Sequence, residues 1–309
     1  MDPDSNSPEL QAANKSLRYS LKPLLRFIHS QRFINWLTHM RPPVTGPLYD
    51  AAGRDWVELD GVKALCITPH NVQHSDACIL YFHGGAYTLG SPAASEPEAR
   101  RLAINCAIPV YAAQYTTAIR APYPAAMEDA EASYHALLAR GFAPSRIVLA
   151  GTSAGGGLAL GLLHRLLEKG DPLPACVVSL SPWLDLTLSF PSLEQLAKRD
   201  VILSRSWIAR AGALYCSEQQ RVHPEVSPIF GTFTGSPKQL LLYSKVELFR
   251  DEIEVFADTL QEQNVSLQLV HHNHAPHAWP VVAEQTPEAE AAFEVIADFV
   301  ARRLSEVPT

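Results

Sequence analysis

A serine between glycines follows directly after a short apolar run and is the clearest candidate nucleophile in the chain. Ser153 lies in the sequence GTSAGG at 151–156, immediately after the apolar run 147–150. Glycine two places either side of the serine permits a strand-to-helix turn in which larger side chains would clash, and that turn projects the hydroxyl outward. A helix over about 158–167 would complete the required strand, turn and helix. We predict that Ser153 is a nucleophile; the alternative is a turn without chemistry.

A serine hydroxyl is a weak nucleophile near neutral pH, so it needs a histidine base and a carboxylate that orients the base. For this kind of turn the acid and then the histidine follow the serine along the chain. Glu247 lies between a predicted strand at 239–244 and an amphipathic helix over about 251–263. His277 follows the next predicted strand, at 265–270. Both residues would then lie on strand-end loops, where sites form in open α/β sheets.

The choice of base and of acid has alternatives. The segment after the strand at 265–270 is expected to be a loop that holds His271, His272, His274 and His277. A metal site is one interpretation, but the spacing lacks the i, i+4 pattern of helical zinc sites and no cysteine is near, so we predict no metal and no cofactor. His277 is the predicted base, and the other three are expected to be solvated or hydrogen-bonded.

Asp251 is the alternative acid. It would lie in the first turn of the helix at about 251–263, where a carboxylate complements the helix dipole without any catalytic role. Glu247 is therefore the favoured acid.

A second glycine-containing segment could donate hydrogen bonds to the negative charge that develops on an attacked carbonyl oxygen. The apolar run 77–82 leads into the sequence HGGA at 83–86. Glycines let backbone N–H groups face a ligand, and a strand that ends in His-Gly-Gly fits the oxyanion loop of lipases and esterases. We predict an oxyanion hole formed by the N–H groups of Gly84, Gly85 and Ala154.

Several segments together resemble the hormone-sensitive-lipase-like esterases of the α/β-hydrolase superfamily. The resemblance covers roughly residues 78–280, and its segments are HGGAYTLGS at 83–91, GTSAGG at 151–156, SPWLDLT at 181–187, DVILS at 200–204 and HPEVSPIF at 223–230. It implies an α/β-hydrolase fold, with a mostly parallel central sheet flanked by helices and a helical cap, and a serine esterase activity. In the family's register Glu247 falls where a catalytic aspartate is usual, and His277 falls on the catalytic histidine.

Three positions depart from the family's pattern. The third glycine of the usual HGGG is Ala86, which is expected to narrow the space beside the two main donors. Glutamate replaces aspartate at position 247, and its longer arm can still reach an imidazole. The segment YTTAIRAPYPA at 115–125 stands where the family commonly has YRLAPE, so an arginine and a glutamate are missing, and we interpret this as an altered structural ion pair.

Composition limits the class of protein and its partners. The chain has 309 residues, 47% of them apolar, which suffices for one large core and one catalytic domain. A net charge of −7 without a strong basic patch argues against nucleic acid or an anionic membrane as an obligatory partner. The five scattered cysteines form neither a metal pattern nor a disulfide framework. The acidic start MDPDSNSPEL lacks a signal-peptide pattern, so we expect a cytoplasmic protein.

The expected organisation is a core in two parts, 46–184 and 229–309, with cap segments at 1–45 and 185–228. Within the first cap segment, residues 15–41 form a basic amphipathic stretch. We expect two helices that cover the mouth of the site; a helix on a membrane surface is the alternative. The second cap segment is too apolar for a solvated loop and is expected to supply pocket walls, although simple packing onto the core would also explain it.

At the ends of the core, two further elements are expected. A strand pair around 56–59 and 63–68 should turn at Asp60-Gly61. The last helix, over about 287–304, and the strand before it could lie at the edge of a homodimer.

These features predict a serine carboxylesterase that hydrolyses small to medium hydrophobic esters through an acyl-enzyme. Two other classes stay open. The same scaffold and triad could perform acyl transfer, elimination or ring closure in specialised metabolism, where the physical difference would be exclusion of water from the acyl-enzyme. A non-catalytic binding protein is the third possibility, but such proteins generally lose a member of the triad.

Overall fold

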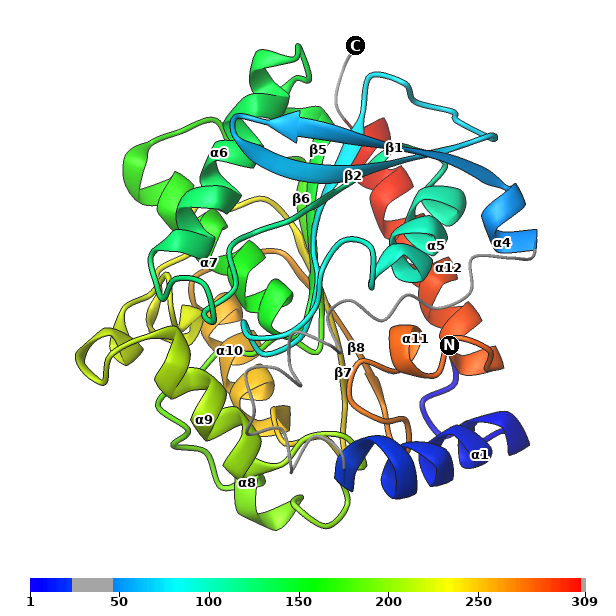
Figure 1. Cartoon of the computed structure of the whole chain (residues 1–309), viewed down its shortest axis with the longest axis vertical. Helices are drawn as coiled ribbons and strands as arrows, with labels where there is room; N and C mark the ends of the chain where they lie inside the picture. Colours follow the sequence, from blue (N-terminus) through cyan, green and yellow to red (C-terminus); the bar gives the residue numbers. More distant parts are fainter. Residues whose placement is uncertain (24–46, 307–309) are drawn as a thin grey trace.

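The computed structural model describes residues 1–23 and 47–306, and its centre is one eight-stranded sheet (Figure 1). The strands lie side by side in the order β1-β2-β4-β3-β5-β6-β7-β8. Pairing is antiparallel from β1 to β2 and from β2 to β4, and parallel everywhere else. The strands are β1 (Ala52–Leu59), β2 (Val62–Pro69), β3 (Cys78–Phe82), β4 (Val110–Ala113), β5 (Ile147–Thr152), β6 (Cys176–Leu180), β7 (Gln239–Ser244) and β8 (Leu267–His272).

Burial along the strands follows their place in the sheet. Every residue of β3, β5, β6 and β7 is buried, as expected for parallel strands that helices cover on both faces. The edge strand β1 is mostly exposed. It forms the predicted hairpin with β2, and the turn lies at Asp60 and Gly61, both of which have positive φ.

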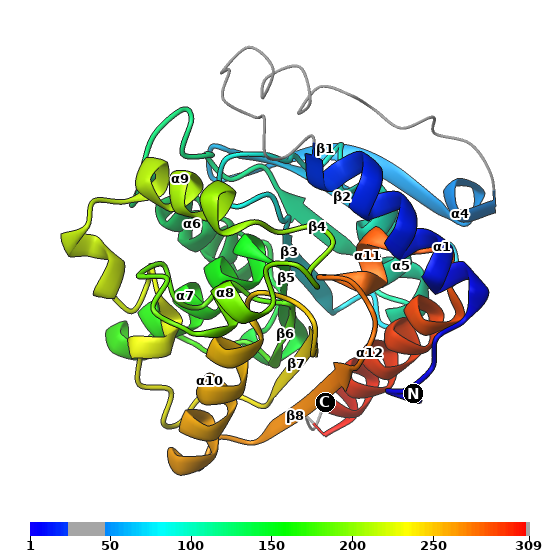
Figure 2. The ribbon, with the colours of Figure 1, turned by 90° about the horizontal axis from the view of Figure 1, so that it is seen from below.

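Helices cover both faces of the sheet (Figures 1 and 2). On one face α5 (Glu96–Cys106) packs against α12 (Pro287–Ser305), and the short α11 (Trp279–Val282) packs against α12. On the other face α6 (Ala125–Ala139) packs against α7 (Ala154–Lys169), with α10 (Arg250–Glu262) nearby. Two hydrophobic clusters correspond to these faces. The structure therefore has the predicted α/β class and layered arrangement.

Two segments outside these layers pack near the carboxyl ends of the strands. The segment 185–228 contains α8 (Ser192–Gln195), α9 (Arg205–Tyr215) and the 3₁₀ turn Gln219–Val222, and a second 3₁₀ turn, Pro228–Phe230, begins at its last residue. At the amino terminus, α1 (Pro8–Ser16) continues into a π-helical turn, Leu17–Leu21. Arg18 donates a hydrogen bond to the carbonyl of Lys198, so the two segments touch each other. The larger part of the amphipathic stretch predicted at 15–41 lies outside the described residues.

Several boundaries differ from the prediction. Strand β8 begins two residues later than expected and ends at His272, so His271 and His272 lie in the strand and not in the loop after it. Helix α7 begins at Ala154, directly after the serine, because the tight turn leaves only Ser153 between strand and helix. Two further elements complete the described part of the chain, namely α4 (Pro47–Asp50) and a 3₁₀ turn at Pro144–Arg146. No helix among the described residues is long and apolar enough to cross a membrane.

Five neighbouring strands end at the same edge of the sheet, and each is followed by a residue that belongs to the site. These strands, β3, β5, β6, β7 and β8, run in parallel, so their carboxyl ends meet. The residues that follow them, in the same order, are His83, Ser153, Ser181, Glu247 and His277.

Candidate active site

Ser153 occupies a strained turn between β5 and α7. Its φ is +56° and its ψ is −118°, a conformation that non-glycine residues rarely adopt and that recurs at active sites. A Cβ atom on Gly151 would lie 2.1 Å from the carbonyl oxygen of Gly155, and a Cβ on Gly155 would lie 2.0 Å from that of Phe82. Both predicted glycines are therefore required by close backbone contact at this turn.

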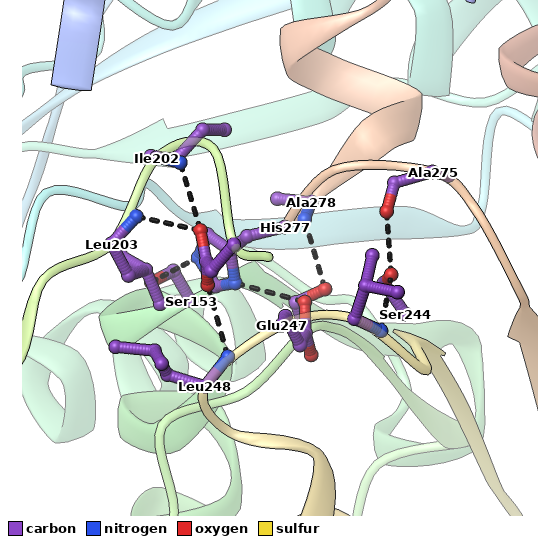
Figure 3. Close-up of polar contacts among 12 residues, drawn as sticks. Ser153, Ile202, Leu203, Ser244, Glu247, Leu248, Ala275, His277 and Ala278 are labelled. Atoms are coloured by element: carbon purple, nitrogen blue, oxygen red, sulfur yellow. Dashed lines mark hydrogen bonds and ion pairs between the residues drawn. The ribbon is translucent and has the colours of Figure 1, made fainter. Parts of the chain in front are cut away.

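Ser153, His277 and Glu247 form one hydrogen-bonded chain (Figure 3). The Ser153 Oγ lies 3.0 Å from His277 Nε2, and His277 Nδ1 lies 3.0 Å from Glu247 Oε2. A carboxylate only accepts hydrogen bonds, so Nδ1 carries the proton and Nε2 is left to accept from the serine hydroxyl. The structure thus brings together the three residues that the sequence selected.

The acid is buried and close to the histidine. Glu247 has no exposed surface, and burial raises the pKa of its carboxyl, while the neighbouring His277 acts in the opposite direction. Asp251, the alternative acid, lies elsewhere: its carboxylate accepts hydrogen bonds from Arg250 and from the backbone N–H of Ser192. Asp251 therefore anchors α8 against α10 and does not reach His277.

Hydrogen bonds between loops position the acid and the histidine (Figure 3). The Ser244 hydroxyl donates to the carbonyl of Ala275 over 2.5 Å, which ties the loop after β7 to the loop that holds His277. Ser181 accepts a hydrogen bond from the N–H of Ala278 over 3.0 Å, directly beside the histidine. The sequence identified neither serine, since a lone serine after a strand carries no distinguishing pattern.

Asp200 is a second buried carboxylate that supports the acid loop. Its Oδ2 accepts from the N–H of Leu248, 2.9 Å away, and its Oδ1 accepts from the N–H groups of Ile202 and Leu203, each 2.8 Å away. Burial raises the pKa of this carboxyl, while His277 and the three N–H donors act in the opposite direction. Asp200 begins the segment DVILS, whose position the resemblance marked without indicating this role.

The glycine loop after β3 lies beside the serine. Gly84 and Gly85 line the same cavity as Ser153. Within residues 1–23 and 47–306, the N–H groups of Gly84, Gly85 and Ala154 donate to no protein acceptor. Ala86 is buried with a φ of +53° and is not among the residues that line the cavity.

A buried histidine holds this loop in place. The ring of His83 stacks on Tyr115 with 4.3 Å between centroids, and the Tyr115 hydroxyl donates to the His83 carbonyl over 2.9 Å. His83 Nδ1 lies 2.8 Å from the carbonyl oxygen of Gly84. Burial lowers the pKa of His83 to about 4, so the ring is neutral at neutral pH and donates to that carbonyl.

A cavity of about 270 Å³ opens onto Ser153 and His277. Its walls come from both core and outer segments and are mostly apolar. The apolar side chains include Leu89, Val281 and Val282 from the core, Leu21 from the amino-terminal segment, and Ile202, Leu203 and Trp207 from the segment 185–228. Glu98 also lines the cavity, and the sequence analysis did not identify it.

The remaining histidines of the predicted cluster have separate surroundings. His272 is buried, and its Nδ1 accepts from the N–H groups of His274 and Ala275, so it shapes the loop that carries His277. His271 packs beside the ring of Tyr243. In the described part of the chain, no group of three or more His, Cys, Asp or Glu side chains is arranged to hold a metal ion.

Comparisons with known proteins show the family to which the chain belongs. A family model described as the alpha/beta hydrolase fold matches residues 79–281. An acetyl-hydrolase of Streptomyces hygroscopicus is 33% identical over 222 residues, which are 72% of this chain and 74% of the relative. An esterase of Acinetobacter venetianus is 31% identical over 222 residues, or 72% of this chain and 73% of the relative.

Solved structures give the same result. An esterase from the bacterial hormone-sensitive lipase family superimposes with a TM-score of 0.86 at 29% identity and covers 97% of this chain and 99% of that one. The esterase EstE5, soaked with p-nitrophenyl butyrate, gives a TM-score of 0.89 at 25% identity over 97% of this chain and 100% of that one. The chain therefore belongs to the α/β-hydrolase fold family, among the serine carboxylic ester hydrolases related to hormone-sensitive lipase.

Proposed function

We propose that this protein is a carboxylesterase that hydrolyses small to medium hydrophobic esters through an acyl-enzyme formed on Ser153. One observation carries the proposal: the hydrogen-bonded chain from Ser153 through His277 to Glu247 faces a mostly apolar cavity. A serine, a base within hydrogen-bond distance and a group that orients the base make up the arrangement needed for nucleophilic catalysis of acyl transfer.

In acylation, the Ser153 oxygen attacks the ester carbonyl carbon while His277 Nε2 removes the hydroxyl proton. The resulting imidazolium is stabilised by Glu247 and returns the proton to the departing alcohol oxygen. In the second half, His277 removes a proton from water, the hydroxide attacks the acyl-enzyme, and the serine leaves with the proton from the imidazolium. The free acid is then released, and no step uses a metal or an organic cofactor.

The N–H groups of Gly84, Gly85 and Ala154 are proposed to bind the oxyanion in both tetrahedral intermediates. Donors that are fixed before the reaction stabilise developing charge without a cost of reorganisation, and removal of one such donor typically lowers kcat by about 10²–10³. The neutral ring of His83 supports this role, because it holds the Gly84 carbonyl and so fixes the loop that presents the two glycine N–H groups.

The cavity limits the substrate. Its volume of about 270 Å³ suits a short acyl chain and a small alcohol. We propose that the amino-terminal segment and the segment 185–228 act as a cap, since Leu21, Ile202 and Trp207 supply part of the apolar lining.

Burst kinetics with p-nitrophenyl esters from acetate to decanoate would test the proposal. We expect a burst of p-nitrophenolate that matches the enzyme concentration, followed by slower turnover that is fastest for short chains. Ser153→Ala should abolish the burst, and His277→Ala should lower kcat by about 10⁶-fold, as for residues that act as a unit. Absence of turnover on every ester, in a folded protein, would instead favour a lyase, a cyclase or a binding protein. Efficient transfer of the acyl group to an added alcohol in place of water would favour an acyltransferase.

A further inference from the structure

Glu98 is a buried acidic residue in the wall of the catalytic cavity. It lies in the first turn of α5, and only 9% of its surface is exposed. The cavity wall as a whole is mostly apolar, and the cavity reaches Ser153 and His277. A carboxyl group in such surroundings is unfavourable unless a partner compensates for its lost hydration. If the protein itself supplies this partner, a cation or a hydrogen-bond donor should lie beside the Glu98 carboxyl group.

The described residues provide no hydrogen-bond partner for Glu98 Oε2, which is completely buried. They also provide no ion pair to this carboxyl group. Its neighbour Glu96 differs, because Arg54 and Arg100 both pair with that side chain. Two buried glutamates on one helix turn thus have opposite surroundings, and only the one without a cation faces the cavity.

A structural role in capping the helix is also excluded by the geometry. The spacing Ser95-x-x-Glu98 is that of a capping box, in which the glutamate would accept from the N–H of the serine. The N–H of Ser95 instead donates to the carbonyl of Ser91 over 3.0 Å, and Ser95 makes no side-chain cap. Glu98 therefore makes no capping-box hydrogen bond at the start of its helix.

Two hydroxyl groups lie near the Glu98 carboxyl group. The Tyr81 hydroxyl donates to Thr152 Oγ1 over 3.1 Å, and both hydroxyls lower the pKa of Glu98. Burial, together with the charge of Glu284, outweighs them and raises the pKa of Glu98 to about 7. Thr152 directly precedes Ser153, and Glu98 lines the same cavity as these two residues.

We propose that Glu98 is a specificity-determining residue that binds a hydrogen-bond donor, a hydroxyl or amino group, on the ester substrate. The carboxyl group lines the cavity without a cation beside it and is the acceptor that such a group would meet, and the surrounding apolar wall would hold the hydrocarbon part of the same substrate. This inference rests on the proposed esterase function and narrows its substrates from plain hydrophobic esters to esters with one polar substituent. A hydrogen bond to a charged group contributes about 1.5–3 kcal/mol, which corresponds to a preference of about 10- to 100-fold.

Matched pairs of esters test this preference. Methyl 3-hydroxybutyrate is compared with methyl 3-methylbutyrate, and 2-hydroxyethyl butyrate with propyl butyrate, so that each pair differs only by a hydroxyl in place of a methyl group. The first pair places the donor on the acyl part and the second on the alcohol part. Methyl 3-aminobutyrate adds an amino donor to the first comparison. Values of kcat/KM are measured in a pH-stat at pH 8 for the wild type, Glu98→Leu, Glu98→Gln and the control Glu284→Gln.

We expect the wild type to prefer the hydroxylated member of one pair by about 10-fold or more. Glu98→Leu should abolish that preference, so that the two members of the pair are hydrolysed with similar kcat/KM. Glu98→Gln should keep most of the preference for hydroxyl and lose that for the amino group, because the amide still accepts a hydrogen bond but carries no charge. Glu284→Gln removes a nearby charge from outside the cavity wall and should leave the ratio unchanged.

Equal ratios in the wild type and Glu98→Leu for every pair would overturn the assignment of Glu98, even with normal hydrolysis of propyl butyrate. Failure of the wild type to hydrolyse any ester would instead overturn the proposed function. Thermal unfolding of each variant shows that the proteins compared are folded, so a changed ratio reports on recognition and not on loss of structure.

Discussion

The raised pKa of Glu98 predicts that replacement of this residue stabilises the protein at alkaline pH. The pKa rises from an ordinary value of 4.5 to about 7, chiefly because burial disfavours the charged form. A difference of one pKa unit between folded and unfolded protein corresponds to about 1.4 kcal/mol, so ionisation of Glu98 costs the folded state about 3 kcal/mol. Glu98→Gln keeps the shape of the side chain and removes this cost.

The sign follows from proton binding. Between about pH 4.5 and pH 7 the folded protein holds a proton on Glu98 that the unfolded chain has lost, so stability falls as the pH rises through this range. Below the range both states are protonated and the variant gains nothing. Above it, the variant should be more stable than the wild type by about 3 kcal/mol. The other titratable groups that face Glu98 are Tyr81, Tyr115 and Glu284, and they are the same in both proteins.

Equilibrium urea unfolding at pH 5 and pH 8 measures this difference. With a slope of about 3 kcal/mol per molar urea, Glu98→Gln should move the midpoint upward by about 1 M at pH 8 and by much less at pH 5. Because the comparison is made between variant and wild type, the other buried carboxyls cancel. A midpoint difference that is the same at both pH values would refute the reasoning, since it would mean that Glu98 is not ionised at a cost in the folded protein.

Two further predictions concern the support of the nucleophile and of the acid. Asp200→Asn replaces one acceptor oxygen by an NH₂ group, so either the N–H of Leu248 or the N–H groups of Ile202 and Leu203 lose their hydrogen-bond acceptor. We expect kcat for p-nitrophenyl butyrate to fall about 10- to 100-fold, and KM to change as well. An unchanged kcat would contradict this role. Gly155→Ala places a Cβ 2.0 Å from the carbonyl oxygen of Phe82 and should lower the free energy of unfolding by about 3 kcal/mol or more. In the control Gly53→Ala the nearest atom lies 4.0 Å from the new Cβ, so the free energy of unfolding should change little. Equal stability of the two variants would contradict the packing argument.

Much of the fold could be predicted from the sequence because its signals are local. Short continuous apolar runs predicted the bounds of β5 and β7 to within two residues of those observed. The glycine pair around Ser153 predicted the tight turn that the structure contains. The boundary of β8 was missed because its two final residues are histidines, which carry no strand signal of their own. Their pairing with β7 is a tertiary effect.

The three central site residues could also be selected from the sequence, since each occupies a strand-end loop and follows the order that the turn requires. The residues around them could not. Ser181 and Ser244 act through hydrogen bonds between segments that are distant in sequence, and Glu98 resembles a residue of an ordinary helix start. Only the absence of its capping bond and its place in the cavity wall distinguish it, and both are properties of the folded chain.

Asp200 connects the cavity wall to the loop of Glu247, the proposed catalytic acid, and this connection explains why its replacement should affect both kcat and KM. One carboxylate oxygen holds the N–H groups of Ile202 and Leu203, which line the cavity, and the other holds the N–H next to Glu247. Lys22 extends the connection, because it donates to the carbonyl of Asp200 from the amino-terminal segment that supplies Leu21 to the same cavity. A displacement of the wall by a poorly fitting ester would therefore be transmitted to the acid loop, so the fit of the substrate and the alignment of the triad depend on the same buried group.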